Sequence, residues 1–170
     1  MAHGKPGKMS SSRAVETDRS GPGPYRITIV EGDDARDAVR LADACTRIFP
    51  DFDPAYLTGR LAAVSDPALV AAQCDDRIVA FKLGYRRGAS LFYSWLGGVD
   101  PTARRLGLAR RLMEAQHEWA ASAGYGYIET RTRALNVAMI MLNLQHGFII
   151  NGFETDAAGL AVVTQRKRLC

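Results

Sequence analysis

The sequence predicts an α/β protein with a single mixed, largely antiparallel β-sheet of about seven strands flanked by four helices. First, a chain of 170 residues with 47% hydrophobic and 24% charged residues is long enough for one domain with a sizeable core. Second, its apolar residues alternate between the period of strands and the period of helices. Third, these segments follow one another in the order βααβββαβαββ, without an internal repeat, which favours one sheet with helices on its faces.

The N-terminal third is expected to begin with an unstructured segment. Residues 1–24 are rich in Gly, Ser and Pro and hold almost nothing to bury, which predicts a disordered leader before a domain over 25–170. The first strand is expected at the start of that domain, in YRITIV. Asp33 or Asp34 is then expected to cap a helix. One face of this helix gathers its apolar residues: Ala38, Leu41, Cys45 and Ile48.

The rest of the chain supplies the other elements in order. FPDFDPAYLTGRLAAV predicts a proline-broken loop and a short second helix, and ALVAAQCDDRIVAFKLGY predicts two strands joined at Asp75 and Asp76. SLFYSWLGGV predicts a fourth strand, and residues 103–123 predict the longest helix, which ends at Gly124. YGYIETRT predicts a strand, NVAMIMLNLQHG a helix ending at Gly147, and FIINGFE and LAVVTQRKRL a closing strand pair.

The bulk properties exclude several classes of function. A net charge of +4 is too small to argue for a nucleic-acid or membrane-surface partner, and no apolar run reaches the length of a membrane span. Cys45, Cys74 and Cys170 are odd in number and lack metal-ligand spacing, which predicts reduced thiols in a cytoplasmic protein without a metal site.

The junction GGVDPTARRLGLARRLM, residues 97–113, is where a strand is expected to become a helix. The first N–H groups of a helix are unpaired and carry partial positive charge, so a phosphate binds there if no side chain obstructs it. Gly107 and Ala109 are small, and four arginines add cationic donors: Arg104, Arg105, Arg110 and Arg111. The alternative is an ordinary helix start with solvated arginines.

The spacing Arg104-x-x-Gly107-x-Ala109 after Val99-x-Pro101 resembles the acetyl-CoA-binding motif of the GNAT superfamily of N-acetyltransferases. A Gly-Lys-Ser/Thr nucleotide loop and a three-glycine dinucleotide fingerprint are both missing. NVAMIMLNLQHGF is similar to a second family segment, Asn-x-x-x-x-x-Leu-Tyr-x-x-x-Gly-Phe. The resemblance covers residues 25–169, including the order of elements, and implies the GNAT acyl-CoA N-acyltransferase fold.

The last predicted helix divides into two stripes by its periodicity. We expect Val137, Ile140, Met141 and Leu144 to face the core. A second stripe carries Asn136, Met139 and Asn143, which we interpret as a side facing the cofactor. The alternative for the two aligned asparagines is a solvated face.

The resemblance implies an enzyme that transfers acetyl from acetyl-CoA to a primary amine, of a small molecule or a protein, by direct attack in a ternary complex. It places the cofactor between the diverging fourth and fifth strands, with the Gly97 N–H at a bulge holding the acetyl oxygen; a packing glycine is the alternative. The expected cofactor contacts are Gly97, Gly98, Val99, Arg104, Arg105, Leu106, Gly107, Leu108, Ala109, Arg110, Asn136 and Asn143.

The catalytic groups depart from the family pattern. Where relatives commonly carry a Tyr acid, this chain has Asn143, whose amide can donate a hydrogen bond to sulfur but no titratable proton. Glu129, acting through water, is the first candidate base and Tyr93 is the second. The alternative for Glu129 is an ion pair with Arg131 or Arg133.

The acceptor is expected to bind at the loop between the first two helices. Phe49, Phe52 and Tyr56 with Asp51 and Asp53 would form an aromatic, acidic mouth for a cationic amine. Helix caps and core aromatics are the alternative. Two other functions stay open: a CoA-binding sensor or scaffold without turnover, suggested by the missing Tyr, and a basic nucleic-acid binder, which lacks any clustered base-reading element. A homodimer is possible.

Overall fold

The computed structural model describes residues 15–17 and 24–169. Eight strands form one sheet in the order β1-β2-β3-β4-β5-β6-β8-β7, and every neighbouring pair is antiparallel except β5 and β6. The helices and strands are β1 (Val15–Thr17), β2 (Arg26–Glu31), η1 (Asp34–Arg36), α1 (Ala38–Ile48), α2 (Pro54–Ala63), β3 (Ser65–Cys74), β4 (Arg77–Gly88), β5 (Leu91–Val99), η2 (Pro101–Ala103), α3 (Leu108–Ser122), β6 (Tyr127–Arg133), α4 (Val137–Gln145), β7 (Ile149–Thr155) and β8 (Ala161–Arg168).

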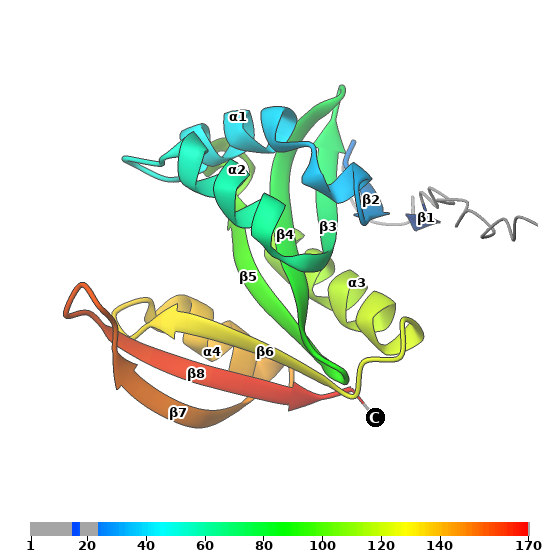
Figure 1. Cartoon of the computed structure of the whole chain (residues 1–170). Helices are drawn as coiled ribbons and strands as arrows, with labels where there is room; N and C mark the ends of the chain where they lie inside the picture. The colour runs from blue at the N-terminus through cyan, green and yellow to red at the C-terminus, as the bar shows by residue number, and fades with distance from the viewer. Residues whose placement is uncertain (1–14, 18–23, 170) are drawn as a thin grey trace, which may run out of the picture.

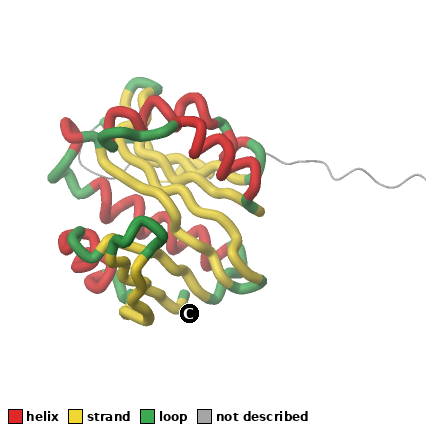
Figure 2. The backbone as a smooth tube through the Cα atoms, turned by 60° about the vertical axis from the view of Figure 1, so that its left-hand side comes forward, coloured by secondary structure: helices red, strands yellow, loops and turns green. Residues whose placement is uncertain are grey.

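The sheet is covered on both faces, as Figure 2 shows. Leu69 and Ala71 of β3 pack in a core cluster with residues of α1 and α2, whereas Val70 and Ala72 pack in a second cluster with residues of α3. Because successive side chains of a strand point to opposite faces, α1 and α2 lie on one face and α3 on the other. Burial on both sides explains why these strands are continuous apolar runs in the sequence.

The strands β5 and β6 are paired over only part of their length. Their parallel register runs from Leu91–Tyr127 to Ser94–Thr130 and then stops. Pairing between β4 and β5 skips Trp95, the extra residue of a β-bulge, and a bulge bends and twists its strand. From this point β5 and β6 separate, which Figure 1 shows as a widening gap between their ribbons.

The predicted α/β class, with its mixed sheet and four α-helices, is confirmed. Two details differ. Asp33 and Asp34 precede and begin the short helix η1, and Asp37 caps α1 by accepting a hydrogen bond from the Val39 N–H. The strand β1, which pairs with β2, lies inside the predicted leader 1–24. It forms because even a short Val-containing segment can pair with the open edge of β2. Residues 1–14 and 18–23 of that leader lie outside the described residues.

The orientation of α4 is also corrected. Val137, Met141 and Leu144, expected in the core, are 59%, 48% and 37% exposed. Met139 and Leu142 instead pack against a core cluster, and the side chain that α4 buries fully is that of Asn143. Nearly every position of this nine-residue helix is apolar, so its sequence does not fix which stripe faces inward.

Within the described ranges, no helix has the length and apolar character that crossing a membrane requires. Nor does the same part of the chain hold a group of three His, Cys, Asp or Glu side chains placed to bind a metal ion. Cys45 is a free, buried thiol, and burial raises its pKa to about 12; Cys74 is free and half-buried, and Cys170 lies outside the described residues.

Candidate active site

A cavity of about 270 Å³ opens where β5 and β6 separate. It lies between the second half of β5, the second half of β6, the first turns of α3 and the start of α4. Its walls are Phe81, Lys82, Ser94, Trp95, Leu96, Gly97, Gly98, Val99, Ala109, Leu112, Met113, Thr130, Arg131, Thr132, Arg133, Asn136, Met139 and Leu142. The predicted cofactor residues Gly97, Gly98, Val99, Ala109 and Asn136 are therefore brought together around one space.

The N-terminus of α3 is uncapped and faces solvent. Gly107 is the N-cap with φ +74°, and no side chain caps the helix. Arg111 is the first residue of this region whose N–H has an acceptor inside the helix, and it donates to the Gly107 oxygen. The first-turn N–H groups of Leu108 and Ala109 are therefore open. A side chain at Gly107 would meet no protein atom within 4 Å, so glycine is required here for its left-handed backbone.

Exposed arginines surround this helix start. Arg105 also has a positive φ of 63°, and the Arg104 Nε donates to the Val99 oxygen at 3.3 Å. Arg110 is paired with Glu114 at 2.9 Å on the outer surface of α3. Of the two leucines in the motif, Leu106 is exposed and Leu108 is buried in the core beneath α3. Because the Leu108 side chain is buried, only the backbone of Leu108 can face a ligand.

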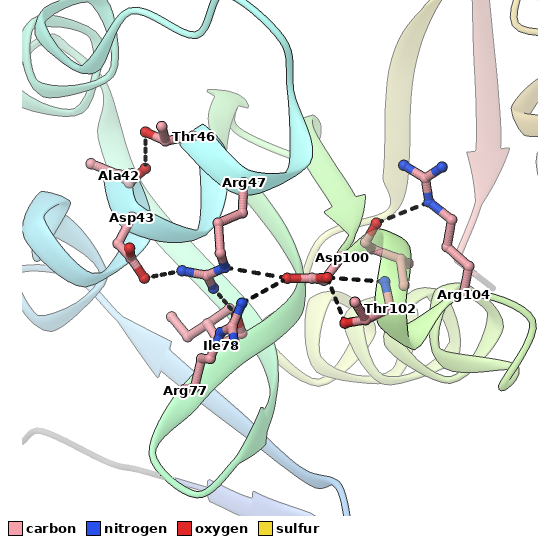
Figure 3. A network of polar contacts seen from close by, with 10 residues as sticks. Ala42, Asp43, Thr46, Arg47, Arg77, Ile78, Asp100, Thr102 and Arg104 are labelled. Atoms are coloured by element: carbon pink, nitrogen blue, oxygen red, sulfur yellow. Dashed lines mark hydrogen bonds and ion pairs between the residues drawn. The ribbon is translucent and has the colours of Figure 1, made fainter.

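Asp100 fixes the loop between β5 and α3 (Figure 3). Its buried carboxylate accepts hydrogen bonds from the N–H and hydroxyl of Thr102 at 3.0 and 2.7 Å, and from Arg47 and Arg77 at 3.2 Å each. Its own N–H donates to the Val79 oxygen. The bonds from Thr102, followed by those from the arginines, lower the pKa of Asp100. Sequence analysis did not select Asp100, although Asp-Pro-Thr is a helix-capping pattern.

The two glycines of β5 are packed from opposite sides. A Cβ at Gly98 would lie 2.5 Å from the Ile48 side chain, and one at Gly97 would lie 3.0 Å from the Phe81 oxygen and 3.3 Å from Lys82. Close packing, the alternative considered for these glycines, is therefore present, and the bulge lies at Trp95 instead. Past Ser94, the edge of β5 toward β6 has no strand partner, so the backbone groups on that edge face the cavity.

Lys82 is a cavity residue that sequence analysis missed. It lies on β4 directly opposite Gly97, and burial lowers the pKa of its ammonium to about 8. No carboxylate lies within ion-pair distance of it in the part of the chain that the structure describes. His117 of α3 is also buried, and burial together with the charges of Lys167 and Lys82 lowers its pKa to about 3. The sequence signal that could have identified Lys82 is a single lysine within an otherwise apolar strand.

Glu129 does not line the cavity. The residue is 4% exposed, and both side-chain oxygens are occupied: Oε1 accepts from Arg87 at 2.9 Å, and Oε2 accepts from Arg166 at 2.9 and 2.6 Å. The ion-pair alternative is therefore present, with different partners from the expected Arg131 and Arg133. With both oxygens engaged by arginines, this carboxylate is not presented to the cavity.

Tyr93, the second candidate base, is also absent from the cavity wall. Its ring is buried beside Tyr85 at a centroid distance of 5.4 Å, with the Arg87 guanidinium 5.0 Å above it. Burial raises the pKa of the Tyr93 hydroxyl, which therefore stays protonated at neutral pH.

Asn143 does not line the cavity, because its side chain is hydrogen-bonded to Gln165. It is 1% exposed, and its Nδ2 donates to Gln165 Oε1 at 2.9 Å, while Gln165 in turn donates to the Ile140 oxygen. The structure thus corrects its expected contact with the cofactor sulfur: Asn143 joins α4 to β8. Asn136 keeps a place in the cavity wall, where its side chain caps α4 by accepting from the Met139 N–H.

Of the predicted acceptor residues, Phe49, Asp51, Phe52 and Asp53 do not line the cavity, whereas Tyr56 is exposed with its ring 6.0 Å from that of the cavity residue Trp95. The Phe49 ring lies 6.2 Å from that of Phe52 and both pack against the core, because the end of α1 must cover β5 at its glycines. Asp53 caps α2 by accepting from the Ala55 N–H, and Asp51 is an exposed turn residue with φ +57°. The alternative, a helix cap and core aromatics, describes Asp53, Phe49 and Phe52.

Comparisons with known proteins agree with this architecture. A family model described as acetyltransferase (GNAT) domain matches residues 12–132. The ribosomal-protein-S18-alanine N-acetyltransferase from Escherichia coli is 18% identical over 84% of this chain and 94% of its own, with a TM-score of 0.70. Ard1 from Thermoplasma volcanium is 19% identical over 85% and 98%, with a TM-score of 0.67.

Nourseothricin acetyltransferase is 20% identical over 61% of this chain, which spans 66% of that protein, with a TM-score of 0.55. A search of curated proteins gave no match. At these identities the solved structures establish a shared fold, while the family model covers well over half of the sequence. The chain therefore belongs to the GNAT acetyltransferase family.

Proposed function

We propose that this protein transfers an acetyl group from acetyl-CoA to a primary amine, of a small molecule or a protein, by direct attack in a ternary complex. The observation that carries this proposal is the cavity at the separation of β5 and β6, which adjoins the uncapped start of α3. Membership of the GNAT family supports the same reaction.

The residues present fit coenzyme A. Its phosphates are anions, and the open N–H groups after Gly107, together with the exposed Arg104 and Arg105, form an anion-binding helix start. Its pantetheine arm carries amides, and the unpaired edge of β5 offers backbone donors and acceptors inside the cavity. Asn136 adds an amide at the start of α4.

Acetyl-CoA, when bound, supplies a thioester whose carbonyl carbon bonds to the amine nitrogen while its bond to sulfur breaks. Backbone N–H groups near Gly97 on the open edge of β5 can donate to the carbonyl oxygen, as charge develops there. The reaction also releases one proton from the amine and needs one at the departing sulfur.

Lys82 is the group in the cavity wall that can supply a proton. With a pKa lowered to about 8, its Nζ is mostly protonated at pH 7 and holds that proton more weakly than an exposed lysine does. Asn143 is engaged with Gln165 and Glu129 with two arginines, and neither residue lines the cavity. We therefore assign loss of the amine proton to solvent.

The test is an acetyl-CoA turnover assay with thiol release as the readout, against a panel of primary amines. In parallel, calorimetry should show coenzyme A binding more tightly than dephosphorylated pantetheine, because the helix start binds the phosphates. Equal affinities would contradict the assignment of that site. Tight binding without turnover of any amine would instead favour the sensor or scaffold.

A further inference from the structure

The sheet face beneath α2 carries a row of aromatic and charged side chains next to the cavity. Tyr85, Tyr93, Glu129 and Arg166 are paired in register across β4, β5, β6 and β8. Residues that are directly paired in a sheet point to the same face, so these four side chains form one continuous row.

Guanidinium groups are held over this row in defined positions. Arg60 of α2 donates to the Tyr85 hydroxyl and lies 5.3 Å above its ring, and Arg87 lies 5.0 Å above the Tyr93 ring. Arg166 completes the group by its paired bonds to Glu129. We call Arg60, Arg87, Arg131 and Arg166 the arginine face.

The arginines are ordered but still accessible. The side chains of Arg87 and Arg166 are 48% and 42% exposed, and Arg60 is exposed as well. An ordered guanidinium loses little side-chain freedom when it binds, and its planar fork matches the two oxygens of a carboxylate. These groups are therefore prepared to bind an anion.

Positive charge on the arginine face exceeds the negative charge near it. Arg87 and Arg166 share the single carboxylate of Glu129, and the partner of Arg60 is a neutral phenol. Arg131 is paired with Glu154. The face thus holds two positive charges that no carboxylate of the group balances.

The arginine face is continuous with the cavity. The Trp95 ring lines the cavity and lies 6.0 Å from the rings of both Tyr85 and Tyr56, and Arg131 lines the cavity too. An amine that enters between β5 and β6 from the α2 side therefore passes over this face. The other end of the same molecule remains near the guanidinium groups.

We propose that the natural acceptor is an amine that also carries a carboxylate, and that the arginine face binds this carboxylate. The inference rests on the proposed acetyl transfer and specifies its substrate class. It replaces the cationic acceptor expected from Asp51 and Asp53, because Asp53 caps α2 and neither residue faces the cavity.

The first experiment compares acceptors that differ only at the end distant from the amine: 4-aminobutyrate, butylamine and 1,3-diaminopropane. A series of C-terminally amidated peptides, Ser-Glu-Glu, Ser-Gln-Gln and Ser-Arg-Arg, distinguishes an acidic peptide from a small amino acid as the source of the carboxylate. We expect kcat/KM for the carboxylate member to be at least about tenfold higher in one series, as one charge-assisted contact would give. If kcat/KM is highest for the neutral or cationic members, the inference is overturned, but the proposed acetyl transfer is not. No turnover of any member counts against both.

The second experiment uses Arg60→Gln, an exposed position whose loss leaves the Glu129 ion pairs intact. It should raise KM for the preferred carboxylate acceptor about tenfold without changing kcat/KM for its neutral analogue or acetyl-CoA affinity. Arg40→Gln, an exposed arginine of α1 bonded to the Asp76 oxygen, removes the same charge elsewhere and should change none of these. Equal losses for charged and neutral acceptors in Arg60→Gln would overturn the inference.

Discussion

The two sides of the cavity bind through different kinds of group. On the α3 side, most of the groups available to a ligand are backbone N–H donors of β5 and of the helix start, and the exposed side chains of Arg104 and Arg105 lie beside them. On the α2 side they are long side chains, arginines held over tyrosines. Ligand affinity at a site of backbone donors is lost when a substitution changes the backbone conformation. Ligand affinity at a site of charged side chains is lost when a substitution removes a charge.

Under the proposed function, we expect the two sides to respond differently to substitution. Backbone donors are supplied by any residue whose side chain stays out of the way, so a backbone anion site tolerates many sequences. The α2 side depends on the identity of each side chain, so we expect the loss of a single Arg to change which acceptor is favoured. The following predictions test the two sides separately, beginning with the largest effect.

Lys82→Met should remove the proton held in the cavity and lower kcat by roughly 10²–10⁴-fold, the usual contribution of a general acid or base. Acetyl-CoA affinity, measured by calorimetry, should be retained. In the wild type, Lys82 is protonated below its pKa of about 8 and deprotonated above it, so kcat should fall as the pH rises through about 8.

Lys82→Arg provides the control for that pH dependence. A guanidinium keeps its proton throughout the range from pH 6 to 10, so the falling limb of kcat should disappear in this variant. A falling limb that persists in Lys82→Arg would assign the ionisation to another group.

The sequence predicted the strand-to-helix junction before α3 because that junction is local. The motif from Val99 to Ala109 is a contiguous stretch, and its Gly107 has the positive φ that favours glycine. The alternating apolar patterns likewise placed the strands, since burial on both faces leaves a clear signal in each segment.

The α2 side could not be predicted in the same way. Arg60 and Tyr85 are 25 residues apart, and Arg166 and Glu129 are 37 apart, so their contacts exist only after the sheet has formed. Short aromatic and acidic runs such as FPDFD attract attention because they are contiguous, yet here they serve as caps and core. Asn143 was misplaced for a related reason: α4 is apolar on nearly every side, and its burial is decided by Gln165 on β8.

Asp100→Asn should loosen the loop that precedes α3. Losing the charged acceptor for Arg47 and Arg77 should lower the free energy of unfolding by roughly 1.5–3 kcal/mol at neutral pH. The pKa of Asp100 is lowered in the folded state, so its contribution is present at neutral pH and is lost as the pH falls below the ordinary Asp value of 3.8. Thermal unfolding of both proteins against pH should therefore converge in acid, and a constant difference at all pH values would contradict the ion-pair role.

Gly107→Ala and Gly124→Ala form a matched pair at the two ends of α3. Both glycines have positive φ, +74° and +88°, and a Cβ at either would meet no protein atom within 4 Å. Each substitution should cost roughly 1–2 kcal/mol of stability through backbone strain. Only Gly107→Ala should also weaken coenzyme A binding, because it alone shifts the first-turn N–H groups. If calorimetry finds the same affinity in both variants, the cofactor is not held by the start of α3.

Asp53→Ala tests the α2 side with the smallest expected effect. Asp53 accepts a hydrogen bond from the Ala55 N–H at the start of α2, and losing such a cap costs about 1 kcal/mol of stability. Because Asp53 does not line the cavity, KM for cationic and neutral amines should change by the same small factor. Asp53→Asn, which keeps a capping oxygen while removing the charge, should restore most of the stability and leave KM unchanged. If Asp53→Asn instead raises KM for 1,3-diaminopropane but not for butylamine, the carboxylate attracts a cationic acceptor, and the acidic mouth expected from the sequence would replace the arginine face as the acceptor site.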